Sequence, residues 1–173
     1  NTGNAFATLL SGWGAGAWGS GPWNVGVSSV AGVRFWTHSN FGEDLIFGPD
    51  GGSIYYWDAT NGVGTRGVEL SSLSGASDVP LLQNLILVSD ISRFVFCFGT
   101  NEIGSSTIDP TLLRWSDQED AANWTPSATN QAGSLRLSRG TKIVAASQAR
   151  QEILVWTDSS LYSLQYVGAP AVW

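Results

Sequence analysis

Residues 81–99 read LLQNLILVSDISRFVFCFG, and this stretch decides the fold class. An apolar run over residues 81–89 is followed by a short polar break at 90–92, and residues 93–99 alternate apolar and aromatic side chains. Two such runs around a short polar break are typical of a β-hairpin. Because helical periodicity is absent over any useful length of the sequence, we predict an all-β protein.

Similar groups of short runs occur on either side of this hairpin. Before it, strand-like runs surround the turn sequence GPDGG, at residues 33–38, 44–47 and 53–57. After it, a third group of runs lies at residues 142–147, 152–156 and 161–167. The runs that align best, at residues 44–47, 93–96 and 152–155, are spaced roughly 50–60 residues apart, near the length of a propeller blade with loop insertions.

A Trp–Asp element closes a strand in each group. It reads Trp57-Asp58 in the first, Trp115-Ser116-Asp117 in the second and Trp156-Thr157-Asp158 in the third. These repeats predict β-propeller-like blades of short antiparallel strands, forming either a whole propeller or an incomplete one. A β-sandwich with long loops is the competing architecture.

The N-terminal segment differs from the rest of the chain. Residues 11–24, SGWGAGAWGSGPWN, contain no charged side chain and carry Trp13, Trp18 and Trp23 at five-residue spacing. Flexible linkers seldom carry Trp, so we favour an ordered loop whose Trp side chains insert into a neighbouring surface. We divide the chain into a Gly/Trp-rich N-terminal segment, 1–32, and a repeated β-blade domain, 33–173. Since the sequence lacks Met and begins at Asn1, we expect it to be processed or part of a longer polypeptide.

The composition narrows the classes of partner. Charged residues make up 13% of the 173 residues, with 21 Gly and 9 Trp, so much of the surface is neutral and suited to being covered by a partner. The net charge of −6 argues against binding nucleic acid through its phosphates. No run approaches the roughly 18 apolar residues of a membrane span, so we predict no membrane segment.

The sequence offers few residues for catalysis. It has one histidine, His38, and one cysteine, Cys97, which lies in an apolar run and is expected to be a core thiol. The glycine-containing loops at 12–16 and 62–64 lack the Lys of a phosphate-binding loop. We therefore predict no metal site, no cofactor and no enzymatic activity.

Residues 112–126, LLRWSDQEDAANWTP, carry the densest set of carboxylates. Asp117, Glu119 and Asp120 could supply the carboxylate pair of a glycosidase. The run from Ser116 to Glu119 also matches a capping box, in which Ser116 caps the helix and Glu119 returns to the Ser116 amide. We favour this interpretation, and predict a capped helical turn that Pro126 prevents from extending.

The same run resembles a known family. Together with the NQAG at 130–133, the LRL at 135–137, the IVAA at 143–146 and the RQEILVWTD at 150–158, it is similar to tail nozzle proteins, or tail tubular proteins of type B, of short-tailed bacteriophages. The resemblance covers about residues 112–170. It implies a β-propeller-like subunit of a homohexameric ring in the virion tail, in contact with the tail adaptor and other tail proteins, through which DNA passes without specific binding. No catalytic residues come with it.

A carbohydrate-binding or receptor-binding β-propeller is the alternative function, because Trp faces stack on sugar rings. A glycosidase that uses Asp117, Glu119 or Asp158 is a third hypothesis. We expect Trp115, Trp124 and Trp156 to be largely buried. The structural or assembly candidates are Trp13, Trp18, Trp23, Trp57, Asp58, Arg114, Trp115, Ser116, Asp117, Glu119, Trp124, Trp156 and Asp158.

Overall fold

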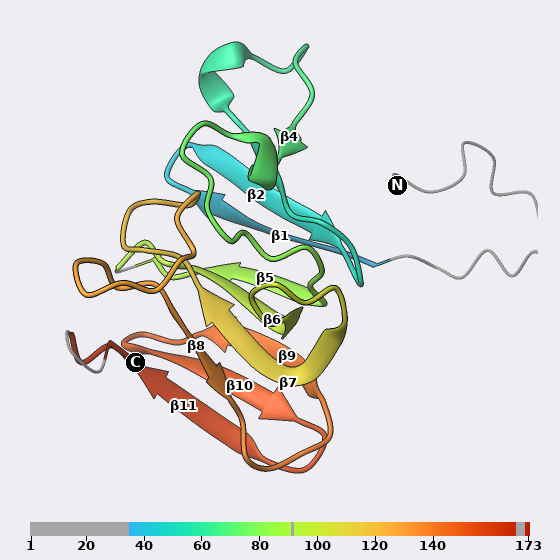
Figure 1. The fold of residues 1–173 in the computed structure, drawn as a ribbon, viewed down its shortest axis with the longest axis vertical. Helices are drawn as coiled ribbons and strands as arrows, with labels where there is room; N and C mark the ends of the chain where they lie inside the picture. Colours follow the sequence, from blue (N-terminus) through green and yellow to red (C-terminus); the bar gives the residue numbers. More distant parts are fainter. Residues whose placement is uncertain (1–34, 91, 169–171) are drawn as a thin grey trace, which may run out of the picture. The chain divides into compact units, whose positions relative to one another are not determined.

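The computed structural model describes residues 35–90, 92–168 and 172–173 of the chain. They form three antiparallel sheets that follow one another in chain order (Figure 1). The helical elements of this part are two short 3-10 turns, η1 (Ala59–Asn61) and η2 (Leu70–Ser72), and it contains no α-helix. The all-β prediction is therefore confirmed for the described residues. None of their helical elements is long and apolar enough to cross a membrane.

Each sheet is a meander in which consecutive strands pair. The first sheet consists of β1 (Trp36–Phe41), β2 (Asp44–Pro49), β3 (Tyr55–Trp57) and β4 (Val68–Glu69). The second consists of β5 (Leu85–Val88), β6 (Val95–Asn101), β7 (Ile108–Trp115) and β8 (Gly133–Arg136). The third consists of β9 (Ile143–Gln148), β10 (Glu152–Thr157) and β11 (Leu161–Gln165).

The hairpin predicted from residues 81–99 is present as β5 and β6. Its register pairs Leu85 with Phe98 and Val88 with Val95. The strand predicted over residues 33–38 is present in part: β1 begins at Trp36 and continues to Phe41, whereas residues 33 and 34 lie outside the described residues. Gly42, with φ of 70°, allows a two-residue turn that leads directly from β1 into β2.

The second sheet is covered on both faces. One face packs against the first sheet around Ile46, Ile86 and Val95. The other face packs against the third sheet around Phe96 and Ile153. Every residue of β6 is buried as a result, which is the pattern of a strand in a central sheet layer.

The first strands of the sheets lie side by side. β5 contacts both β1 and β9. The hydroxyl of Thr37 accepts a hydrogen bond from the Ile86 amide at 3.1 Å, and the hydroxyl of Ser39 accepts one from the Val88 amide at 3.1 Å. β5 is an edge strand of its sheet, so these hydroxyls satisfy amides that would otherwise lack a partner.

Residues 35–90, 92–168 and 172–173 show no closed barrel or propeller, so the propeller-like arrangement stays a prediction. The range Phe35–Trp173 forms one compact unit. The N-terminal segment at 1–32, with Trp13, Trp18 and Trp23, lies outside the described residues.

A glycine sets how closely the first two sheets approach. Gly48 is buried on β2, and a Cβ added there would lie 2.6 Å from the Gln83 side-chain nitrogen and 2.7 Å from the Ser53 carbonyl oxygen. The Gln83 side chain is itself fixed, because its amide donates to the Pro49 carbonyl at 2.9 Å. The space at Gly48 is therefore needed by the chain that connects the first and second sheets.

We expect Gly48→Ala to lower the free energy of unfolding by about 1–3 kcal/mol, as overpacked core positions do. Gly64→Ala is the matched control, because no heavy atom lies within 4 Å of an added Cβ at that position. Its expected change is within about 0.5 kcal/mol. Urea denaturation measures both, and equal stabilities of the two variants would contradict the proposed close approach.

Candidate functional site

Arg114 combines a charged side chain with nearly complete burial. It lies on β7 and is 2% exposed, and it is the only charged side chain that is buried among the residues that the structure describes. Across the sheet it faces Cys97 of β6, which is also buried, as predicted. Burial raises the pKa of the Cys97 thiol, which favours its neutral form.

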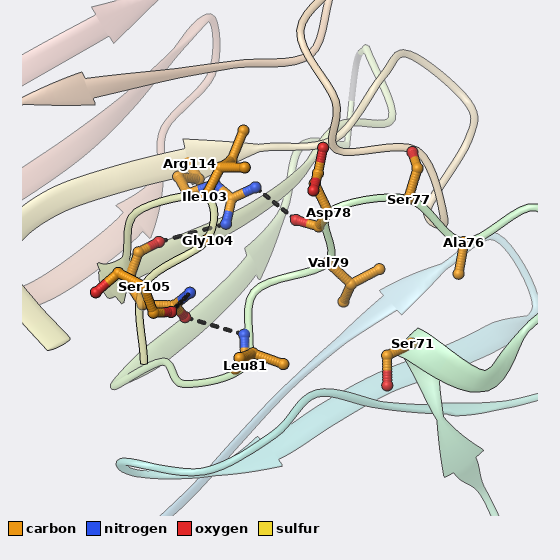
Figure 2. A pocket seen from close by; sticks show the side chains of 11 residues that line it. Ser71, Ala76, Ser77, Asp78, Val79, Leu81, Ile103, Gly104, Ser105 and Arg114 are labelled. Atoms are coloured by element: carbon orange, nitrogen blue, oxygen red, sulfur yellow. Dashed lines mark hydrogen bonds between the residues drawn. The ribbon is translucent and has the colours of Figure 1, made fainter. Parts of the chain in front are cut away.

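Backbone carbonyl groups compensate the buried guanidinium. Figure 2 shows Arg114 directed at the backbone of Asp78, where Nη2 donates to the carbonyl oxygen at 2.5 Å. Nη1 donates to the carbonyl oxygen of Asn101 at 3.3 Å. The guanidinium carbon also lies 6.0 Å from the ring centre of Trp124, within the range of a cation–π interaction. Burial lowers the pKa of Arg114, and the nearby Asp78 carboxylate opposes this shift.

These contacts join two loops from different parts of the chain. Ser77 donates from its amide to the Ala122 carbonyl at 3.0 Å, and the Trp124 amide donates to the Ser77 carbonyl at 3.0 Å. The Thr125 hydroxyl donates to the Asp78 carboxylate at 2.6 Å. Asp78 has φ of 48°, in the left-handed region, so the loop conformation depends on these partners. We call this arrangement of Arg114, Trp124 and the loop at 76–78 the Arg114 junction.

A cavity of about 270 Å³ opens beside the junction, and its lining includes Arg114, Asp78 and Ser105 (Figure 2). The Asn101 side chain closes one side of it. Its carbonyl oxygen accepts the amides of Leu81 and Leu82 at 2.9 Å each, and its NH₂ group donates to the Ser105 carbonyl at 2.9 Å. The polar groups of this wall thus hold loops together. Arg114 is among the candidates selected from the sequence, whereas Asp78 and Asn101 belong to no recognisable motif and were missed.

The capped helical turn predicted for residues 116–123 is wrong. Asp117 and Asp120 instead form an isolated antiparallel bridge around a tight turn, and Glu119 has φ of 57°, which no α-helix contains. The Ser116 hydroxyl accepts the Val95 amide of β6 at 3.1 Å, so it caps no helix. The Asp117 carboxylate accepts the amides of Gln118 and Gln131 at 2.8 Å each. Ser116 and Asp117 thus bind residues from other parts of the chain, and Ser116 lacks the local partner that a capping box would supply.

The tryptophans selected from the sequence have different environments. Trp115 and Trp124 are buried, as predicted, and their indole nitrogens donate to the carbonyls of Gln131 at 2.7 Å and Ala121 at 2.8 Å. Trp156 is partly buried and is not among the exposed large side chains, so the prediction that it is largely buried holds only in part. It lies on β10, where the core positions alternate with it and are taken by Val155 and Thr157.

The aspartates of the Trp–Asp elements support loops. Asp58 accepts hydrogen bonds from the Thr60 hydroxyl and from the Thr60 amide at 2.8 Å, and it caps η1; the hydroxyl bond, followed by the amide bond, lowers the pKa of its carboxyl group. Asp158 accepts bonds from the Thr141 hydroxyl and from the Thr141 amide at 2.8 Å, and these lower the pKa of its carboxyl group in the same way. The indole of Trp57, which precedes Asp58 in the chain, donates to the Thr65 carbonyl at 2.9 Å. The three elements therefore share a position at strand ends while differing in their partners.

Within the described ranges, no group of three or more His, Cys, Asp and Glu side chains could hold a metal ion. The chain matches no protein-family model, no curated protein and no solved structure. The geometry of the described residues is therefore the basis for the functional proposals below.

We expect Arg114→Met to destabilise the protein by about 3 kcal/mol, because each buried carbonyl that loses its donor costs about 1–3 kcal/mol. Arg136→Met is the matched control: Arg136 pairs with Glu102 and Asp109 at 2.6 Å each, but its side chain is 55% exposed. Exposed ion pairs contribute about 1 kcal/mol or less. Chemical denaturation measures both variants, and equal losses would show that Arg114 does not brace the loops.

Proposed function

We propose that this chain is a structural, non-catalytic subunit that assembles with copies of itself by continuing its own stack of sheets. The resemblance of residues 112–170 to tail nozzle proteins gives the setting. In that setting, the chain is one subunit of a homohexameric ring in a bacteriophage tail. The ring contacts the tail adaptor and forms part of the conduit for DNA. The observation that carries the proposal is that the two end sheets have partly exposed apolar side chains on their outer faces, whereas the middle sheet is covered on both sides.

The outer face of the first sheet is aromatic. Trp36, Phe47 and Tyr55 lie next to one another across β1, β2 and β3, with ring centres 5.6 Å apart for Phe47–Tyr55 and 6.1 Å apart for Trp36–Phe47. Trp36 is 45% exposed. Ile46, which alternates with these residues along β2, is fully buried against the second sheet. We call Trp36, Phe47 and Tyr55 the aromatic face.

The outer face of the third sheet is aliphatic and aromatic. Leu154 and Trp156 alternate on β10 with the core residues Ile153 and Val155, so they lie on the opposite side of the sheet. Leu161 of β11 pairs with Trp156 and is 56% exposed. We call Leu154, Trp156 and Leu161 the β10 face.

A second copy of the chain is the occupant that continues this arrangement. The aromatic face and the β10 face differ from each other, so a contact between them is head-to-tail, and repeated head-to-tail contacts form closed rings when the rotation closes. The contact would repeat the sheet-on-sheet packing that already joins the first to the second sheet and the second to the third. The number of subunits, six, comes from the family resemblance.

The charge of the chain is compatible with a conduit. A net charge of −6 disfavours adhesion to the phosphates of passing DNA. Neutral and apolar surface would lie between subunits, since charged residues are only 13% of the sequence.

We expect sedimentation analysis of the purified chain to show a ring of several copies. Trp36→Asp and Trp156→Asp each place a carboxylate in one of the two faces that must meet, so either variant alone should shift the chain to the monomer. Val63→Asp is the matched control, because Val63 is 96% exposed and lies in the loop between β3 and β4.

Retention of the ring by Val63→Asp, with its loss in both Trp variants, is the predicted result. A wild-type chain that stays monomeric at high micromolar concentration would overturn the proposal. Rings that survive Trp36→Asp would place the interface on another surface.

A further inference from the structure

A second cavity, of about 370 Å³, lies between the β5–β6 turn and one end of the third sheet. It is separate from the Arg114 junction and from the aromatic face, because it shares no lining residue with either. Its volume is at the lower end of the roughly 300–1,000 Å³ of small-molecule sites, so it suits a small ligand.

Two buried hydroxyl groups line the cavity on the side of the second sheet. Ser89 and Ser92 are 2% and 5% exposed, and their hydroxyl oxygens lie 2.8 Å apart. Two hydroxyls have two hydrogens, but the bond between them uses only one. Neither hydroxyl bonds another described residue, so one O–H donor is left for a ligand.

The third sheet contributes an acceptor without a partner. The NH₂ group of Gln148 donates to the carbonyls of Ala149 at 2.7 Å and Glu152 at 3.3 Å, which fixes the orientation of the amide. Its carbonyl oxygen, Oε1, is buried and has no hydrogen-bond partner among the described residues. Gln148 therefore offers one acceptor in a defined position.

The indole of Trp173 contributes an unpaired donor. Its ring is held edge-on by Phe94 at 5.4 Å and Phe96 at 4.9 Å between ring centres, and its nitrogen is buried with no partner among the described residues. Tyr166 lies 5.4 Å from the same ring and provides an apolar surface beside these polar groups. Such a combination of ring faces and neutral polar groups suits the C–H and O–H groups of a sugar.

The charges of the lining exclude other ligand classes. No Lys or Arg is among the described residues that line the cavity, so a phosphate or carboxylate ligand would find no cation. The one carboxylate there, Glu152, already accepts hydrogen bonds from the side chains of Ser163 and Gln165. A wholly apolar ligand would leave the donor and acceptor groups unpaired.

We propose that this cavity binds a neutral, polyhydroxylated ligand, one or two sugar units in size, through Ser89 or Ser92, Gln148 and Trp173. The site does not depend on the assembly function proposed above. A sugar bound there would occupy the cavity and would not stack on the aromatic face.

Saturation-transfer NMR with glucose, galactose, N-acetylglucosamine and maltose, each at millimolar concentration, tests the site. Gln148→Leu removes the amide while keeping a similar shape. We expect the affinity for the bound sugar to fall about tenfold, the effect of losing one hydrogen bond. Asn61→Leu, at an exposed position of η1, is the amide control, and Trp36→Ala tests stacking on the aromatic face. Both are expected to bind like the wild type.

A thermal melt by circular dichroism establishes that each variant is folded. If Gln148→Leu does not fold, Ser92→Ala replaces it and is expected to weaken binding severalfold by removing a hydroxyl. Absence of a signal from all of the sugars would overturn the proposal, as would undiminished binding by the folded cavity variant. Binding that is lost in Trp36→Ala would also overturn it and place the sugar on the aromatic face.

Discussion

The burial of β6 on both faces is the constraint on which the rest of the structure depends. All residues from Val95 to Asn101 are buried, so the second sheet needs an apolar layer on each side. The first and third sheets supply these layers, and the hydroxyls of Thr37 and Ser39 satisfy the edge of β5 at the same time. The end sheets pack on the middle sheet through one face only, and their outer faces have partly exposed apolar side chains. In the proposed assembly, the next copy of the chain covers such a face by the same sheet-on-sheet packing.

The Arg114 junction shows how a charged group can be structural in a protein with few charged residues. Its guanidinium is held by the carbonyls of Asp78 and Asn101 and by the ring of Trp124. Because a buried cation is costly unless such partners surround it, the loops that supply them are fixed relative to the second sheet. The carboxylates of Asp117 and Asp158 bind backbone amides in a similar way. Charged side chains that are catalytic candidates in the sequence therefore form hydrogen bonds that hold loops in this structure.

The sequence predicts those parts of the fold that depend on local patterns. Alternation in residues 93–99 and the turn residues before them are sufficient to predict the β5–β6 hairpin, and the aligned runs at 44–47, 93–96 and 152–155 fall on or next to the second strand of each sheet. The capping box failed because the Ser116 hydroxyl accepts the distant Val95 amide, and the adjacent Asp117 carboxylate accepts the distant Gln131 amide, which the local sequence cannot reveal.

The exposure of individual side chains and the positions of the cavities were harder to predict, because both depend on contacts between distant parts of the chain. Trp115 and Trp156 occur in similar Trp–Asp elements, yet Trp115 is buried in a middle sheet and Trp156 lies on the outer side of an end sheet. Layer position is a tertiary property, so the motif does not contain it. The cavity beside Gln148 was missed because its residues, from the β5–β6 turn, β9 and residue 173, share no spacing in the sequence.

A cryo-electron microscopy reconstruction of the assembled chain tests the central claim most directly. The account predicts that Trp36, Phe47 and Tyr55 of one copy lie against Leu154, Trp156 and Leu161 of the next, so that every sheet in the ring has a neighbour on both faces. A reconstruction in which both of these faces are exposed to solvent, or in which copies meet through other surfaces, would contradict it.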